Sequence, residues 1–169
     1  RPRYLMRKHF LKKILEKLKC DDQNLFDFGY GAGDAFRMYH DMGFHISGYD
    51  FSEEAQTYCQ NTNRDLPLEL FTSIDQIPLN YYDFVIACEV LEHIEDAQAI
   101  VEQWRSYLKE SGHLIISVPA HQSRWDASDV YSGHVKRYER NDLVELLVQC
   151  RFDGIQVFTY DFPSCLVLD

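Results

Sequence analysis

The 169-residue sequence has no long apolar stretch and no cysteine pair at the spacing of a metal site. No run approaches the roughly 20 apolar residues that cross a bilayer, and the first residues show no signal-peptide pattern. The first residue is Arg1 rather than Met, as expected for an excised domain or a processed chain. Five scattered cysteines without a Cys-x-x-Cys motif argue against a disulfide framework and a zinc knuckle. They favour reduced thiols and a cytoplasmic location.

Basic residues are scarce beyond the first nineteen positions. Residues 1–19 hold eight Lys or Arg and one acid, so the rest carries nine bases and twenty-six acids, for a net charge of −10. An acidic body repels phosphate backbones, which disfavours a nucleic-acid substrate. The basic segment is suited to weak contact with an anionic partner or a membrane surface, although a solvated helix face is the simpler explanation.

The length fits one domain, with a basic amphipathic helix over residues 1–19 and the main body over residues 20–169. In the first segment, apolar residues recur at helical spacing at Leu11, Ile14, Leu15 and Leu18. Further along, we expect strands at residues 25–28, 44–49, 68–71, 83–88, 113–118 and 154–160. We expect helices at residues 34–42, 52–63 (capped by Ser52), 97–109 and 141–150 (capped by Asn141), and a long loop over residues 120–138.

Strands that alternate with helices predict βαβ units. The expected fold class is therefore α/β, a doubly wound and mostly parallel sheet with helices on both faces. In such a sheet a ligand binds beyond the carboxyl ends of the strands. The unusual residue clusters of this sequence all fall at such ends.

The first cluster is a glycine-rich turn after the first expected strand. Gly29, Gly31 and Gly33 permit positive φ and let a ligand approach the backbone. A dinucleotide fingerprint would need a third glycine where Asp34 or Phe36 stands, and a phosphate-binding loop would need a Lys-Ser/Thr pair. The carboxylate of Asp34 would also repel a pyrophosphate. The turn therefore favours a cationic or zwitterionic nucleoside over a diphosphate.

The second cluster is an acid at the end of the second expected strand. Asp50 follows Gly33 by seventeen residues, and a carboxylate there can accept both hydroxyls of a ribose. Phe51 is placed to lie against an adenine face. Alone, an Asp before Ser52 is an ordinary helix-capping signal. Together with the glycine turn, it favours ribose binding.

These segments resemble class I S-adenosylmethionine-dependent methyltransferases. The matching motifs are D-x-G-x-G-x-G at residues 27–33, G-x-D-x-S at 48–52, a sequence similar to F-D-x-V-x-x-x-x-V-L-E-H at 82–94, and one similar to L-K-P-G-G-x-L at 108–114 with Glu-Ser in place of Pro-Gly. Residues 118–120 and 133–138 resemble the V-P-A and G-H-x-R-R-Y segments of one subgroup. The resemblance covers about residues 20–162.

The resemblance implies S-adenosylmethionine as the methyl donor and S-adenosylhomocysteine as the product. The implied cofactor contacts are Asp27, Gly29, Tyr30, Gly31, Gly33, Asp50, Phe51, Ser73, Ile74, Glu89 and Val90. Tyr30 stands where the family often has a small residue, so a narrowed or partly covered turn is expected. Thr72 and Ser73 stand where many members place an acid. The family fold ends in an antiparallel strand pair, and only its first strand is evident here, which leaves open a sheet without its last strand.

Two histidines are candidate general bases. Methyl transfer is an in-line displacement that depends mainly on placing the acceptor, although an oxygen or nitrogen acceptor also needs a base for its proton. His93 and His134 are the candidates; an orienting or capping role for His93 and a loop-pinning role for His134 are the alternatives. Lys136, Arg137 and Tyr138 could bind an anionic group of the acceptor. The loop's acids and histidines match no compact metal site, so no metal is expected.

The expected function is methyl transfer to a small molecule or to the head of a glycan or lipid precursor. One rival is a non-catalytic S-adenosylmethionine-binding module that supports another methyltransferase, which a missing last strand would favour. The other is a nicotinamide-dependent oxidoreductase, against which the glycine spacing argues.

Overall fold

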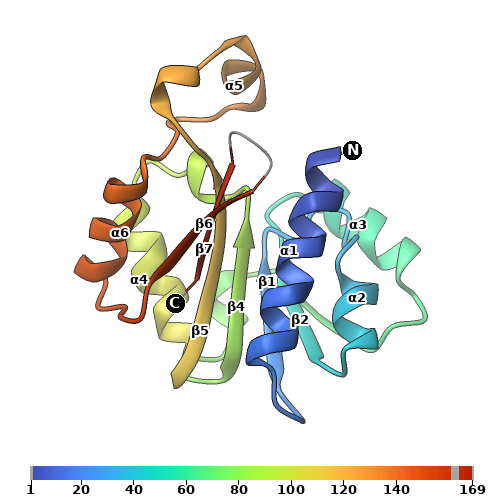
Figure 1. The fold of residues 1–169 in the computed structure, drawn as a ribbon. Coiled ribbons are helices and arrows are strands. Elements are labelled where there is room, and N and C mark those ends of the chain that lie inside the picture. The colour runs from blue at the N-terminus through green and yellow to red at the C-terminus, as the bar shows by residue number, and fades with distance from the viewer. Residues whose placement is uncertain (1, 161–163, 169) are drawn as a thin grey trace.

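In the computed structural model, which describes residues 2–160 and 164–168, seven strands form one sheet in the order β3-β2-β1-β4-β5-β7-β6 (Figure 1). Five strands run parallel: β1 (Asn24–Phe28), β2 (His45–Tyr49), β3 (Leu68–Phe71), β4 (Tyr82–Cys88) and β5 (Leu108–Pro119). Two run antiparallel: β6 (Gln156–Tyr160) and β7 (Ser164–Leu168). The predicted doubly wound, mostly parallel sheet is confirmed.

Helices cover both faces of the sheet. They are α1 (Pro2–Leu18), α2 (Phe36–Asp41), α3 (Glu53–Thr62), α4 (Ala97–Tyr107), α5 (Ala127–Ser132) and α6 (Arg140–Gln149), with short 3-10 helices η1 (Ile74–Gln76), η2 (Leu91–His93) and η3 (Gln122–Arg124). Successive strand residues point to opposite faces. Accordingly, Leu25 packs in a core cluster with Leu15 of α1, whereas its neighbour Phe26 packs in a second cluster with Trp104 of α4. None of the helices in the described parts is long and apolar enough to cross a membrane.

The helix starts follow the local sequence only in part. Ser52 caps α3 as predicted, its hydroxyl accepting a hydrogen bond from the Ala55 N–H at 3.2 Å. Asn141 is not the cap of α6, because that helix already begins at Arg140. Glu139 occupies the capping position in an extended conformation. Its carboxylate makes no capping bond to α6 and accepts a hydrogen bond from the Gln122 N–H.

The last antiparallel strand, which the sequence did not reveal, is present. β7 lies between β5 and β6 and pairs with both, so that Leu168 stands opposite Ile115 on one side and Gln156 on the other. An apolar run of five residues is too short for periodicity to identify as a strand. Its long-range pairing with β5 places it in the sheet, and β6 becomes the edge strand.

Two further segments differ from expectation. We expected residues 108–112 to form a helix end and a turn, but they extend β5 at its start. The pairing of β5 with β4 shifts register between Tyr82 and Phe84, and this irregularity accommodates the extra residues. The expected long loop contains η3 and α5. In Figure 1, α5 stands above the end of the sheet at which the N-terminal end of α1 also lies.

Candidate active site

The glycine turn adopts the backbone conformation that its sequence predicts. Gly29, Gly31 and Gly33 have φ of +76°, +55° and +70°, in the left-handed region that side chains other than glycine rarely adopt. A Cβ at Gly29 would lie 2.5 Å from Val90 Cγ2, so Val90 is packed directly against the turn. Gly29 also donates its N–H to the Tyr49 carbonyl at 2.7 Å, which ties the turn to the end of β2.

Asp50 meets this turn from the neighbouring strand. Its carboxylate is buried; one oxygen accepts the Gly31 N–H at 2.8 Å and the other accepts the Ser52 N–H at 2.9 Å. Each carboxylate oxygen has two lone pairs, so both can still accept a ribose hydroxyl. Phe51, adjacent to it, is 83% exposed, which leaves its ring available to an adenine. The acid and the turn are therefore assembled as expected, and the nucleoside contacts themselves stay a prediction.

Asp27 and Tyr30 lie on the protein side of the turn. Burial raises the pKa of Asp27 to about 7, partly offset by the hydrogen bond that Tyr39 Oη donates at 3.1 Å. The Tyr30 ring is turned inward against Phe36, with ring centroids 5.2 Å apart, and against Gly48. It is buried, so the large residue at this position packs into the core.

Glu89 and its surroundings bring α1 into the site. Glu89 directly follows β4 and has φ of +58°, and its carboxylate accepts a hydrogen bond from the Ser117 hydroxyl at 2.8 Å. The same oxygen lies 3.5 Å from Arg7 Nη1, and Lys8 donates to the Asp34 carbonyl at 3.0 Å. The first turns of α1 thus lie beside the turn and the end of β4. Sequence reasoning missed Arg7, because nothing in its local pattern shows where the helix docks.

The predicted adenine contacts lie after β3. Ser73 precedes η1, and its N–H and that of Thr72 point at the Gln76 side-chain oxygen at 3.3 and 3.2 Å. Ile74 is half-buried against the core cluster that includes Phe28. Both residues follow the strand next to β2, as the prediction requires, and their contact with adenine stays a prediction.

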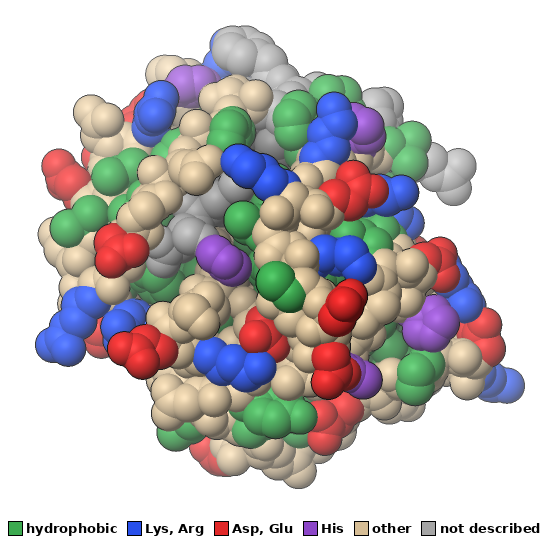
Figure 2. Space-filling view, turned by 60° about the horizontal axis from the view of Figure 1, so that its bottom comes forward, with side chains coloured by type: hydrophobic (Ala, Val, Ile, Leu, Met, Phe, Trp, Pro, Cys, Tyr) green, Lys and Arg blue, Asp and Glu red, His purple; other side chains and the backbone are tan. Residues whose placement is uncertain are grey.

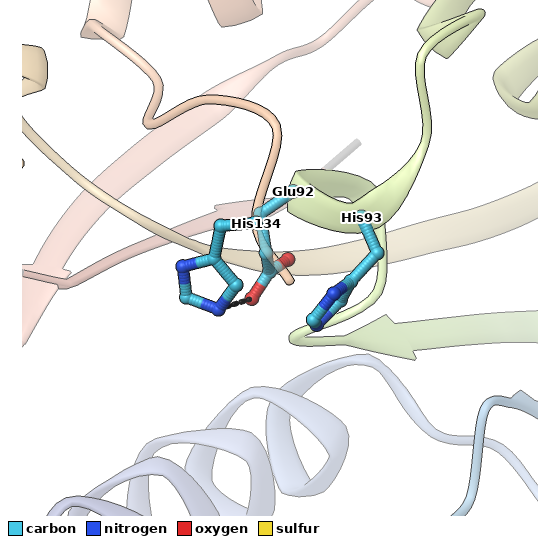
Figure 3. Close-up of side chains that lie close together, drawn as sticks. All are labelled: Glu92, His93 and His134. Atoms are coloured by element: carbon cyan, nitrogen blue, oxygen red, sulfur yellow. Dashed lines mark ion pairs between the residues drawn. The ribbon is translucent and has the colours of Figure 1, made fainter. Parts of the chain in front are cut away.

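The two candidate bases come together beyond the end of β4. His93 belongs to η2 and His134 follows α5, yet their ring centroids are 4.9 Å apart in an edge-to-face arrangement (Figure 3). His93 Nδ1 lies 3.2 Å from the Gly133 carbonyl, and the Val135 N–H donates to the Glu92 carbonyl at 2.7 Å. These two contacts hold the segment after α5 against η2. His93 is exposed and His134 half-buried.

A buried carboxyl group that sequence reasoning missed lies between them. Glu92 is fully buried, and its carboxylate oxygens have no hydrogen-bond partner among the described residues. One of them lies 4.0 Å from His134 Nε2 (Figure 3). Burial, with the nearby charge of Glu89 adding to it, raises the pKa of Glu92 and favours its protonated form. The Glu-His pair of the V-L-E-H motif was the available signal, and only its histidine was singled out.

A second buried acid orients His134. Asp129 accepts two hydrogen bonds from Arg137, at 2.9 Å from Nε and 2.8 Å from Nη2, and its Oδ1 lies 2.8 Å from His134 Nδ1. Burial alone would raise the pKa of Asp129, but the bonds from Arg137, from the Asp126 N–H and from His134 hold it below its usual range. An ionised Asp129 requires a proton on Nδ1, which leaves the Nε2 lone pair facing Glu92. Because Arg137 is buried in this ion pair, it is not placed to bind an acceptor.

Metal ligands in the loop do not assemble as a group. His121 lies beside Glu139, at 3.2 Å, and Asp126 caps α5. In the described part of the chain, ligand atoms within 4.8 Å of one another occur at Glu92, His93 and His134. Carboxylate and imidazole groups suit transition metals such as zinc. The expectation that methyl transfer needs no metal here stays a prediction.

Comparison with known proteins identifies the fold and the family. The chain is similar to a ubiquinone biosynthesis O-methyltransferase of Rickettsia typhi, with 30% identity over 118 residues, 63% of this chain and 47% of that protein. A Bradyrhizobium protein of the same name is 26% identical over 97 residues, 55% of this chain and 38% of that protein. The chain thus spans less than half the length of these curated relatives.

Solved structures show the same fold. An S-adenosylmethionine-dependent methyltransferase from Mesorhizobium loti superposes with a TM-score of 0.72 at 16% identity, covering 92% of this chain and 95% of that one. A putative methyltransferase in complex with the Haloferax volcanii activator Trm112 superposes with a TM-score of 0.74 at 16% identity, covering 96% of this chain and 88% of that one. A family model described as a methyltransferase domain matches residues 2–157. The chain therefore belongs to the methyltransferase-domain family.

Proposed function

We propose that the protein methylates a hydroxyl group of a small-molecule acceptor, with His134 as the general base. The observation that carries this proposal is the placement of His134 beyond the end of β4, with Nδ1 held by buried Asp129 and Nε2 left as a proton acceptor. Relatives named as O-methyltransferases support an oxygen acceptor. The acidic body of the chain argues against nucleic acid.

The residues at the glycine turn fit the methyl donor. The turn presents backbone where a Cβ would collide with Val90, and the Asp50 carboxylate faces it from the next strand. When bound, S-adenosylmethionine supplies an electrophilic methyl group on a positively charged sulfur. The buried Asp50 carboxylate at the turn favours a positive ligand.

Proton removal is the chemistry that the histidine cluster can supply. As the acceptor oxygen bonds to the methyl carbon and the carbon–sulfur bond breaks, the hydroxyl proton passes to Nε2 of His134. The resulting imidazolium is stabilised by the ionised Asp129 at Nδ1, and Glu92 lies 4.0 Å from Nε2 on the other side. The proton then leaves to solvent, which reaches His93 at the surface.

The surface near the histidines suits an apolar acceptor. Val130, Tyr131 and Val135 flank His134 in sequence and are 67%, 94% and 43% exposed. Exposed apolar side chains that lie together on a surface are typical of binding sites for apolar groups. We therefore propose hydroxylated aromatic compounds as the first acceptors to test.

The test separates proton removal from donor binding. Formation of S-adenosylhomocysteine is measured with a panel of hydroxylated aromatic acceptors, and donor affinity is measured by calorimetry. We expect His134→Gln to lower kcat by about 100-fold or more while affinity for S-adenosylhomocysteine stays unchanged. Asp50→Asn should instead weaken that affinity by about tenfold.

His93→Ala serves as the matched control, because the His93 ring lies next to the His134 ring. Asp129 bonds His134, whereas His93 Nδ1 lies beside the Gly133 carbonyl. A larger loss of kcat in His93→Ala than in His134→Gln would contradict the assignment of the base. Donor binding without turnover on any acceptor would favour the non-catalytic module, although the presence of β7 removes the structural argument for it.

A further inference from the structure

A groove of about 1150 Å³ lies at the end of the sheet opposite to the glycine turn. Its lining comes from the second half of α1, the start of β5, the residues just before β4, and the segment from Arg151 into β6. Figure 2 shows the molecule turned so that this end comes forward, with Lys and Arg side chains spread over the face. The seven residues of β4 span roughly 20 Å, so the groove is separate from the donor site.

Apolar side chains form one part of the groove. Phe10, Ile14 and Leu18 recur every fourth residue along α1 and therefore lie on one stripe of the helix. Leu79 and Phe158 complete this part, and they are 62% and 42% exposed. Apolar side chains gathered in a groove and left open to water indicate a binding site for an apolar group.

Positive charge forms the other part. The lining includes five basic side chains, Lys13, Lys17, Arg105, Lys109 and Arg151, and two acidic ones, Glu110 and Asp153. Lys109 is engaged by Asp83 at 2.7 Å, whereas none of the other four bases forms an ion pair with a side chain in the described ranges. This excess of positive charge stands out in a chain whose net charge is −10. It favours a ligand with an anionic head.

We propose that the groove binds a monomeric amphiphile with a phosphate head and a single apolar tail. Lysine and arginine are the side chains that bind phosphate, Arg105 and Arg151 through paired N–H groups and the lysines as point charges. The stripe of α1 with Leu79 and Phe158 would receive the tail. The volume suits an extended ligand, because pockets for drug-sized molecules usually measure about 300–1,000 Å³.

The test uses dodecyl phosphate below its micellar concentration, with binding measured by titration calorimetry. Inorganic phosphate supplies the head alone, and dodecyl maltoside supplies the tail with an uncharged head. We expect each of these to bind at least about tenfold more weakly than dodecyl phosphate, because inorganic phosphate lacks the apolar tail and dodecyl maltoside lacks the anionic head. Equal binding of dodecyl maltoside, or binding only to vesicles that contain anionic lipid, would overturn the proposal.

Charge substitutions on α1 locate the site. The double variant Lys13→Gln/Lys17→Gln should weaken dodecyl phosphate binding by about tenfold. The control is Lys12→Gln, which removes one positive charge at an exposed neighbour that pairs with Glu16 and does not line the groove. Leu79→Ser should weaken dodecyl phosphate and leave inorganic phosphate unaffected.

Binding of S-adenosylhomocysteine shows that each variant is folded, because the donor site is at the other end of the sheet. An equal loss with Lys12→Gln and with the double variant would mean non-specific attraction to α1. Undiminished dodecyl phosphate binding by a double variant that still binds S-adenosylhomocysteine would place the ligand elsewhere. Either result refutes the groove as the site.

Discussion

At the scale of single residues, buried acids distinguish this site from an ordinary sheet edge. Asp27, Glu92 and Asp129 are all buried, and their surroundings determine their charge in different ways. Arg137 keeps Asp129 ionised, whereas burial raises the pKa of Asp27 and that of Glu92. Asp129 thus orients the imidazole of His134, while Asp27 and Glu92 retain their protons up to higher pH than ordinary carboxyl groups.

Asp27→Asn should change how stability depends on pH. The folded-state pKa of about 7 exceeds the ordinary value of 3.8, so folding binds a proton more tightly and the wild type loses stability as pH rises from about 4 to about 7. The variant lacks this loss and should be more stable than wild type at pH 8, by about 1–3 kcal/mol, with no such gain at pH 4. Urea denaturation at both pH values measures the difference.

Asp34→Asn is the control for this prediction, because Asp34 lies in the same turn but is exposed. It should shift the free energy of unfolding by less than about 0.5 kcal/mol at either pH. The same gain at pH 4 and pH 8 in Asp27→Asn would show that titration of Asp27 is not the cause.

The predictability of the site also differs from residue to residue. The glycines and Asp50 could be identified, because a turn with positive φ and an acid after a strand leave local patterns. Glu92 and Asp129 could not, because their roles arise from burial and from contacts across long stretches of sequence. His93 and His134 were identified separately, and only the fold shows that they are neighbours.

At the scale of elements, α1 does more than present a basic surface. Its apolar side packs on the sheet, with Leu11 and Leu15 buried, while its first turns reach Glu89 through Arg7. The amphipathic helix was predictable from residue spacing. Its docking position was not, because that depends on the shape of the sheet face it covers.

Leu15→Ala should destabilise the fold by about 2–5 kcal/mol, because Leu15 is fully buried against the sheet and truncation leaves a cavity. The measurement is the denaturant dependence of unfolding followed by circular dichroism. Lys12→Ala, on the exposed side of the same helix, should change the unfolding free energy by less than about 0.5 kcal/mol. Equal effects of the two variants would mean that α1 is not part of the core.

At the scale of the whole molecule, the sheet has a protected centre and two edges. β1 and β4 are paired on both sides, whereas β3 and β6 are the edge strands. The alternation of strands and helices made the parallel part predictable. Of the antiparallel pair, β6 was predicted, but β7 was not, because β7 is short and its place depends on pairing with β5, far back in the sequence.

Hydrogen exchange followed by mass spectrometry should reflect this arrangement. Amides in β4 should exchange most slowly, through global unfolding, and those in β3 and β6 considerably faster. Amides at the end of β5 should be protected nearly as well as those in β4, because β7 pairs with that part of the strand. Rapid exchange there would contradict the position of β7.

The position of β7 also has a consequence for synthesis of the protein. A strand near the end of this sequence is inserted between two made earlier, so β6 can join the sheet only after residues 164–168 have left the ribosome. Until then the edge of β5 that faces away from β4 has no partner strand, and chaperones protect such exposed edges in growing chains.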